Sequence, residues 1–435
     1  DAVPLDRSRL GASSGWLSRH FSRPMTPSTA IQQGARASLV LVFFAFPMSV
    51  ALANVGLLLT LMFWLLGLVW GSSVRDTRQA LSNPATLPAL ALFAWIAVAA
   101  LWSPAEGGQI AGAVQKYSKF LMLPIFIGLL QDASLRRRCW QAFALAMLFT
   151  LAVTWFNIWF DFAWTRTHNQ GFGQDHTVFK DRIAQGILMS FFTVMAMHQA
   201  TQAPSRARAI LAGGVASLAA FSVLFLSAGR TGYLALLLSL AVFSVFAAGL
   251  NARRLAIVVA AIAAVLVLAF TTSTQLQTRL FQAWTEFQHS DLSTPVTSVG
   301  ARVEMARFSL RTALDAPLFG HGTAAYPVLA NAHFTDPTWC SVVCVHPHNQ
   351  FVLFLFELGL VGLTLFLWFV FAIAWQAWRK NAPHRALMLA FLAILVVSNM
   401  THSSFWLSTE NHFFILMTAL LMAAAWRKMP DARAP

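Results

Sequence analysis

The stretch ILAGGVASLAAFSVLFLSA, Ile210 to Ala228, contains no charged residue and decides the fold class. A transmembrane helix needs about 20 mainly apolar residues to cross the hydrocarbon core of a bilayer. A second uncharged run extends from Leu255 to Gln275. Over the 435 residues, 57% are hydrophobic and only 11% are charged, whereas soluble domains carry about a quarter charged residues. The sequence therefore predicts an all-α polytopic membrane protein.

Apolar segments of spanning length recur along the chain, and we expect about twelve transmembrane helices. They are centred near residues 45, 63, 94, 124, 150, 190, 218, 241, 263, 363, 393 and 417. The predicted regions are a tail at 1–36, helices within 37–271, an outer loop domain at 272–349, helices within 350–426 and a tail at 427–435. The first tail is polar and lacks the apolar segment of a cleavable signal peptide.

The net charge of +14 raises the question of a nucleic-acid partner, but the positions of the basic residues argue against one. If both termini lie on the same side, most of the 30 Lys and Arg residues fall in short loops or tails on that side, including Arg75, Arg136 and Arg253. This distribution is the positive-inside bias of cytoplasmic loops. We therefore expect both termini in the cytoplasm, the lipid bilayer as a partner, and no nucleic acid.

One predicted outer loop, 272–349, is far longer than the usual connection between helices, and such loops are commonly functional. Apolar residues recur at helical spacing from Leu276 to Phe287 and again from Val303 to Ala313. A proline and the Gly-His-Gly turn at 320–322 end the second of these patterns. The loop is predicted to be a small helical domain.

Basic residues on the outer face run against the topology bias, so each needs its own explanation. Arg230 follows the quoted apolar run directly, and an arginine at that depth must find an anion, a carbonyl or water. Snorkelling to the lipid head groups is the competing interpretation. Arg302 has no acidic residue three or four positions away. Lys180 and Arg182 stand at the start of a span, where they are either solvated or help to hold a phosphate.

The segment CSVVCVHPHNQ, Cys340 to Gln350, brings two cysteines and two histidines together in the sequence. Structural zinc sites usually use two ligand pairs separated by a longer loop, and Pro347 stiffens this short segment. Thiols in an oxidising compartment such as the periplasm tend to form disulfides. We therefore favour a Cys340–Cys344 disulfide over a zinc site and expect no metal.

The two histidines of this segment, His346 and His348, are candidate catalytic residues. An isolated loop histidine is more often solvated or hydrogen-bonded in a core, but this pair lies where the large outer loop re-enters the membrane. Asn349 adds a neutral group that could orient an imidazole ring or a sugar. A neutral imidazole, with an ordinary pKa of about 6.5, can accept a proton near neutral pH.

Taken in order, these motifs resemble the O-antigen ligase/polymerase family of bacterial envelope glycosyltransferases. The resemblance covers about residues 210–375, and the earlier part of the chain matches only in its run of spans. It rests on SAGR ending at Arg230, PLFGHG at 317–322, HPHN at 346–349 and FELGL at 356–360.

The resemblance implies a GT-C-like membrane glycosyltransferase that works at the periplasmic face of the inner membrane without metal, nucleotide or other cofactor. Its implied donor is a glycan on undecaprenyl pyrophosphate, and a ligase would use a lipid A-core acceptor. The family pattern implies His348 as the base with His346 in support, and Arg230 and Arg302 on the pyrophosphate. Glu357 would orient an arginine or a histidine.

Other functions remain open at this point. A polymerase would use a second carrier-linked glycan as the acceptor, and a protein O-oligosaccharyltransferase would use a protein. About twelve spans is also a common transporter count, but transporters usually show internal repeats. No matching halves are evident in this sequence.

Overall fold

A computed structural model describes residues 27–69, 73–248, 274–288, 296–379 and 384–425, together with scattered residues between 253 and 272. The predicted tail at 427–435 and the first 26 residues of the tail at 1–36 lie outside the described residues. The predicted span near residue 263 falls largely outside them as well.

The described residues form helices and contain no strand. The helices are α1 (Pro27–Ala45), α2 (Val50–Val69), α3 (Val74–Ala80), α4 (Thr86–Ala99), η1 (Ala100–Trp102), α5 (Gly107–Tyr117), α6 (Lys119–Leu129), α7 (Ala133–Phe156), α8 (Arg182–Thr201), α9 (Arg206–Phe225), α10 (Arg230–Ala248), α12 (Thr274–Gln288), α13 (Ser298–Ala313), α14 (Ala325–His333), α15 (Pro337–Val343), α16 (Gln350–Trp378), α17 (Arg385–Thr401) and α18 (Ser408–Ala425).

Among the described helices, 6 are long and apolar enough to cross a membrane, namely α2, α7, α8, α9, α10 and α16. Two shorter apolar segments, Thr86–Trp102 and Arg385–Thr401, join them. The chain is therefore a multi-pass helical membrane protein, as predicted. The described helices do not establish the expected count of about twelve spans.

Two predicted spans differ from the structure. The first was expected to be centred near residue 45, but α1 already ends at Ala45 and a turn follows. Pro47 explains the end, because proline has no amide hydrogen and disfavours the helical conformation of the residue before it. The segment near 124 forms only α6, an 11-residue helix. At about 1.5 Å per residue, α6 is too short to cross about 30 Å of hydrocarbon.

The helix α18 lies at the centre of the bundle, because nearly all of its side chains are buried. It packs against α6, α8 and α16. Stacked and edge-on phenylalanines fill the surrounding core, for example Phe191 and Phe413 with ring centroids 5.4 Å apart. Such aromatic pairs add to the burial of apolar surface.

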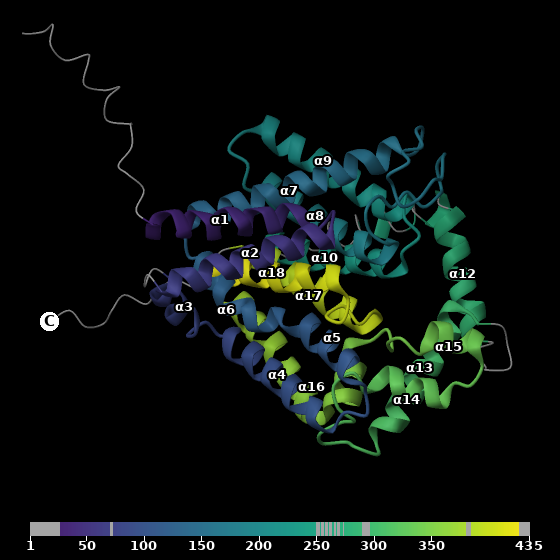
Figure 1. Ribbon diagram of the computed structural model, residues 1–435. Coiled ribbons are helices and arrows are strands. Elements are labelled where there is room, and N and C mark those ends of the chain that lie inside the picture. The colour runs from purple at the N-terminus through teal and green to yellow at the C-terminus, as the bar shows by residue number, and fades with distance from the viewer. Residues whose placement is uncertain are drawn as a thin grey trace, which may run out of the picture.

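The large outer loop contains α12, α13, α14 and α15, which gather at one end of the bundle (Figure 1). The predicted helical patterns within it correspond to α12 and α13. The side chains of Leu276, Leu280 and Phe287 lie outside the described part. A second apolar core, which includes Phe308, Tyr326 and Trp339, ties α13, α14 and α15 to Phe356 of α16.

The helix α16 is interrupted at Gly359, which adopts φ 67° and ψ −166°. The backbone groups freed by this interruption pair with the segment Pro317–Gly322, and we call this arrangement the clasp. Its hydrogen bonds are His321 N to Phe356 O at 3.0 Å, Gly322 N to Glu357 O at 2.8 Å, Leu360 N to Pro317 O at 2.8 Å and Val361 N to Leu318 O at 3.2 Å. Only glycine fits at the crossing, because a Cβ atom at Gly320 would lie 2.4 Å from the Glu357 carbonyl carbon.

Candidate active site

The close packing of α8 and α10 positions two arginines at one end of the bundle. Gly186 and Gly232 face each other so closely that a Cβ atom at Gly186 would lie 2.9 Å from the Gly232 Cα atom. Arg182 and Arg230 are the first residues of these two helices. Arg230, the predicted arginine at the end of the apolar run, therefore begins its helix beside Arg182, one of the two cations predicted to help hold a phosphate.

Arg302, on the first turns of α13, completes a cluster of three arginines with Arg182 and Arg230. Burial lowers the pKa of Arg302, and the charges of Arg230 and Arg182 lower it further, while Glu286 acts in the opposite direction. An arginine remains protonated in proteins, so this cluster holds concentrated positive charge in a partly buried place. Such a cluster has a high affinity for phosphate oxygens.

Glu286 of α12 is the anion that this cluster holds in the structure. One carboxylate oxygen, Oε1, lies 3.7 Å from Nη2 of Arg230. The other, Oε2, accepts a hydrogen bond of 3.0 Å from the backbone N–H of Val299, in the first turn of α13. A helix start offers unpaired N–H groups to anions. Arginine and helix start therefore converge on one carboxylate, as they would on a phosphate.

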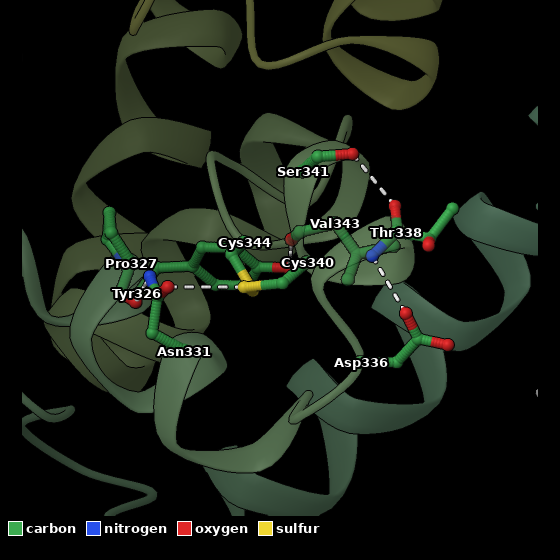
Figure 2. The surroundings of a disulfide bond; sticks show 9 residues. All are labelled: Tyr326, Pro327, Asn331, Asp336, Thr338, Cys340, Ser341, Val343 and Cys344. Atoms are coloured by element: carbon green, nitrogen blue, oxygen red, sulfur yellow. Dashed lines mark hydrogen bonds between the residues drawn. A yellow bond between two sulfur atoms is a disulfide. The ribbon is translucent and has the colours of Figure 1, made fainter.

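The segment before the histidines is closed by a disulfide between Cys340 and Cys344 (Figure 2). Both cysteines are thereby removed as zinc ligands. The hydroxyl of Tyr326 donates a hydrogen bond of 2.9 Å to the carbonyl oxygen of Val343, which ties the end of α15 to α14 (Figure 2). The chain therefore enters the histidine segment from a fixed point.

The other end of the histidine segment is fixed by Asn349, the N-cap of α16. Its side-chain oxygen accepts a hydrogen bond of 3.1 Å from the backbone N–H of Val352. This oxygen of Asn349 therefore caps the helix. The sequence had suggested instead that Asn349 could orient an imidazole ring or a sugar. His348 takes the left-handed conformation with φ 49°. Its backbone N–H donates to Nδ1 of His346 at 3.3 Å, and the two ring centroids are 4.3 Å apart.

A third histidine, His402, which the sequence analysis did not single out, completes this group from the loop between α17 and α18. Its ring centroid lies 5.0 Å from that of His348 and 5.4 Å from that of His346. Gln350 holds the two loops together, because its side-chain oxygen accepts hydrogen bonds from the backbone N–H groups of Phe405 at 2.9 Å and Trp406 at 3.2 Å. The sequence feature that could have identified His402 is its position in a second histidine-bearing segment between predicted spans.

Electrostatics link the histidines to the arginines. Burial lowers the pKa of His348 to about 3, helped by His402 and by the charge of Arg302. Burial also lowers the pKa of His346 to about 2, helped by its two histidine neighbours and by Lys116. Both imidazoles are therefore neutral at neutral pH. Arg302 lowers the pKa of His348, and Arg230 lowers the pKa of Arg302, so the arginines and the histidines lie close enough for their charges to interact.

Two predicted residues have other surroundings. Lys180 is buried, and the acidic groups that act on its charge are Glu410 and Asp181. Lys180 is not part of the arginine cluster. Glu357 accepts a hydrogen bond of 3.3 Å from the backbone N–H of Tyr326 at the start of α14. Through this contact Glu357 anchors α14; its role of orienting an arginine or a histidine, which the resemblance implied, stays a prediction.

A cavity of about 810 Å³ lies away from this site. It is lined by Arg136, Arg137, His198 and His384 among others, which belong to the end of the bundle that the positive-inside bias assigns to the cytoplasm. Volume alone does not identify the candidate active site here.

The fold and the site define the protein as a multi-pass helical membrane protein with a cluster of arginines and histidines at one end of the bundle. Residues 215–367 match the family described as O-antigen ligase. This match supports an O-antigen ligase family protein and suggests a glycosyl-transfer enzyme of the ligase or polymerase type. No curated protein matches the chain.

Proposed function

We propose that the protein is an inverting glycosyltransferase that moves O-antigen glycan from undecaprenyl pyrophosphate to lipid A-core oligosaccharide. The reaction would take place at the periplasmic face of the bacterial inner membrane. The observation that carries the proposal is the anion position between Arg230 and the start of α13, together with the electrostatic influence of Arg302 on His348. A pyrophosphate held by the arginines would thus present its glycan near a neutral imidazole.

The arginine cluster would bind the donor and stabilise its departure. When the bond between the sugar and the pyrophosphate breaks, negative charge grows on the pyrophosphate oxygens. Arg182, Arg230 and Arg302 offer permanent charge and forked donors for that group. The carboxylate of Glu286 marks where an anion sits between Arg230 and the start of α13.

His348 would accept the proton of the attacking acceptor hydroxyl. Its Nδ1 atom is buried and has no hydrogen-bond partner among the residues that the structure describes. The hydroxyl oxygen forms the new bond to the anomeric carbon as the pyrophosphate leaves with the electrons of the old bond. Attack from the opposite side inverts the anomeric carbon. The negative charge of the donor pyrophosphate would also offset the positive charge of Arg302. This offset would raise the pKa of His348 toward its ordinary value.

The arginine cluster supports a reaction without a catalytic metal. Divalent ions in sugar-phosphate enzymes are held by carboxylates, whereas three guanidinium groups and the single carboxylate of Glu286 surround the proposed phosphate position. Three forked cations can take over charge neutralisation and orientation of the pyrophosphate. We therefore expect full activity in excess EDTA.

Reconstitution of the purified protein in vesicles with carrier-linked glycan and candidate acceptors tests the proposal. Capping of the lipid A-core means a ligase, and a lengthened glycan on the carrier means a polymerase. Glycan on a protein acceptor means a protein O-oligosaccharyltransferase. Solute flux without any glycan transfer would overturn the proposal and favour a transporter.

A further inference from the structure

The three histidines His346, His348 and His402 form a compact set of nitrogen ligands. One ring nitrogen from each can be chosen so that all lie within 4.8 Å of one another. Two of the residues come from the segment before α16 and the third from the loop before α18. Three imidazoles with an open fourth position are an established zinc ligand set.

The set is held in place from several sides. The disulfide and the cap of α16 fix the two ends of the segment that carries His346 and His348. The Gln350 side chain fixes the loop that carries His402. Fixed loops lower the entropy cost of gathering ligands around an ion.

One of the imidazoles has an unused nitrogen atom. The Nδ1 atom of His348 is buried and lacks a hydrogen-bond partner within the described part of the chain. His402 itself is 5% exposed. Buried polar atoms are almost always paired, so an unpaired one calls for an explanation.

Glu410 provides the carboxylate that commonly stands behind a metal-binding histidine. Its Oε1 atom lies 3.4 Å from Nδ1 of His402, and both side chains are buried. Such carboxylates orient the ring and strengthen it as a ligand. The negative charge of Glu410 also offsets the nearby cations Lys116 and Arg302, which oppose metal binding.

We propose that His346, His348 and His402 bind a late first-row divalent metal ion, with Zn²⁺ as the representative species. Imidazole ligands suit Zn²⁺, Cu²⁺ and Ni²⁺. Metal–nitrogen bonds of about 2.0–2.1 Å require nitrogens about 3.3 Å apart in a tetrahedral site. The present nitrogen separations of up to 4.8 Å would have to shorten by rotation of the rings to reach that geometry. The cysteines take no part, so this site differs from the Cys–His zinc site that the sequence suggested and that we set aside.

The metal would inhibit glycan transfer, a consequence that rests on the proposed role of His348. A metal ion takes the imidazole lone pair that would otherwise accept the acceptor proton. The ion also adds positive charge next to the arginine cluster. The metal therefore competes with catalysis and is not required by it.

Metal binding is measured first, without reference to activity. The full chain, purified without a polyhistidine tag and with its disulfide intact, is titrated with Co²⁺ and then with Zn²⁺. We expect one Co²⁺ per chain with the visible absorption of tetrahedral cobalt, and its loss on displacement by Zn²⁺. His402→Gln should weaken binding at least about tenfold, because it removes one of three ligands. His346→Gln, measured in parallel, guards against a folding defect of the first variant.

His198→Gln is the matched control for binding. His198 and His384 form the other close histidine pair, with Nε2 and Nδ1 2.8 Å apart, and offer two ligands instead of three. The control should keep the tetrahedral cobalt spectrum. Absence of that spectrum in the wild-type protein, or equal affinity in wild type and both site variants, would overturn the metal site.

Transfer activity separates this inference from the proposed function. Zn²⁺ should inhibit transfer, and EDTA should restore it. If Zn²⁺ binds but does not inhibit transfer, the metal site is supported and the proposed role of His348 as the base is contradicted. Unchanged transfer in a protein that binds no metal removes the metal site and leaves the proposed function intact. Activation by Zn²⁺ would overturn the inhibitory assignment.

Discussion

Gly229 lies directly against the main chain of Arg182, because a Cβ atom at position 229 would stand 2.5 Å from the Arg182 carbonyl oxygen. Backbone atoms cannot move aside as a flexible side chain can, so Gly229→Ala should push the starts of α8 and α10 apart. A displacement of about 1 Å at a catalytic group can cost about 100-fold in rate. We expect a loss of that order in transfer by reconstituted protein.

Gly213→Ala is the control for this substitution, because a Cβ atom there meets nothing within 4 Å. It should keep wild-type transfer and wild-type thermal stability. Equal activity of the two variants would show that the close approach of α8 and α10 is not needed for the site.

Arg230→Lys and Arg302→Lys should each lower kcat for transfer at least about tenfold. Lysine keeps the charge but lacks the forked donors that match phosphate oxygens, and the loss falls on the transition state. Arg311→Lys, on the exposed side of α13, is the control. Wild-type kinetics for both Arg230→Lys and Arg302→Lys would mean that these arginines only set the membrane topology or anchor the helices.

His348→Gln should lower transfer by about 10²- to 10⁴-fold, the usual contribution of a general base. Donor binding, measured separately, should change little because the arginine cluster remains. His333→Gln changes an exposed histidine of α14 and should stay active. Near-normal transfer by His348→Gln would remove this residue as the base.

Glu286→Gln should strengthen donor binding, because the carboxylate occupies the arginine cluster where the pyrophosphate must bind. We expect a lower KM for the carrier-linked donor, by a factor of about three to ten, from loss of a partly exposed ion pair. Gln282→Ala, one turn earlier on α12, is the control. A higher KM in Glu286→Gln would mean that Glu286 helps to build the donor site instead of competing for it.

The pH dependence of donor binding tests Lys180. Burial lowers its pKa to about 8, against the influence of Glu410 and Asp181. Its ammonium group therefore loses its proton as the pH rises through about 8, and the positive charge two residues before Arg182 of the arginine cluster is lost. We expect the KM for the donor to rise between about pH 7 and pH 9.

Lys180→Arg should flatten this rise, since a guanidinium group stays protonated in that range. The comparison is made with the same donor and acceptor at fixed ionic strength, because exposed charges are screened by salt. An equal rise in both proteins would assign the titration to another group.

The fold class followed from the sequence because the bilayer imposes a length and polarity requirement that apolar runs such as Ile210–Ala228 satisfy on their own. Exact helix limits did not follow. Pro47 moved the end of the first helix, and the short α6 replaced a predicted span near residue 124. In both places local backbone chemistry or packing outweighed mean hydropathy.

The candidate site was predictable where a residue conflicted with its surroundings. Arg230 and Arg302 stood out because charge on the outer face of a membrane protein needs a reason. His402 could not be found in this way, since its place beside His348 depends on the hydrogen bonds of Gln350 to a distant loop. The hydrogen bond by which the Glu357 carboxylate anchors α14 could not be found from its motif either, because its partner Tyr326 is 31 residues away in the chain.

The clasp imposes an order of assembly on the chain. A membrane helix ordinarily satisfies its own backbone groups, but the interruption at Gly359 leaves α16 incomplete without Pro317–Gly322. That segment precedes α16 in the chain and so leaves the ribosome first. The backbone groups around Gly359 can therefore be paired only after this segment has docked, so the folding of α16 is completed by the docking of the loop.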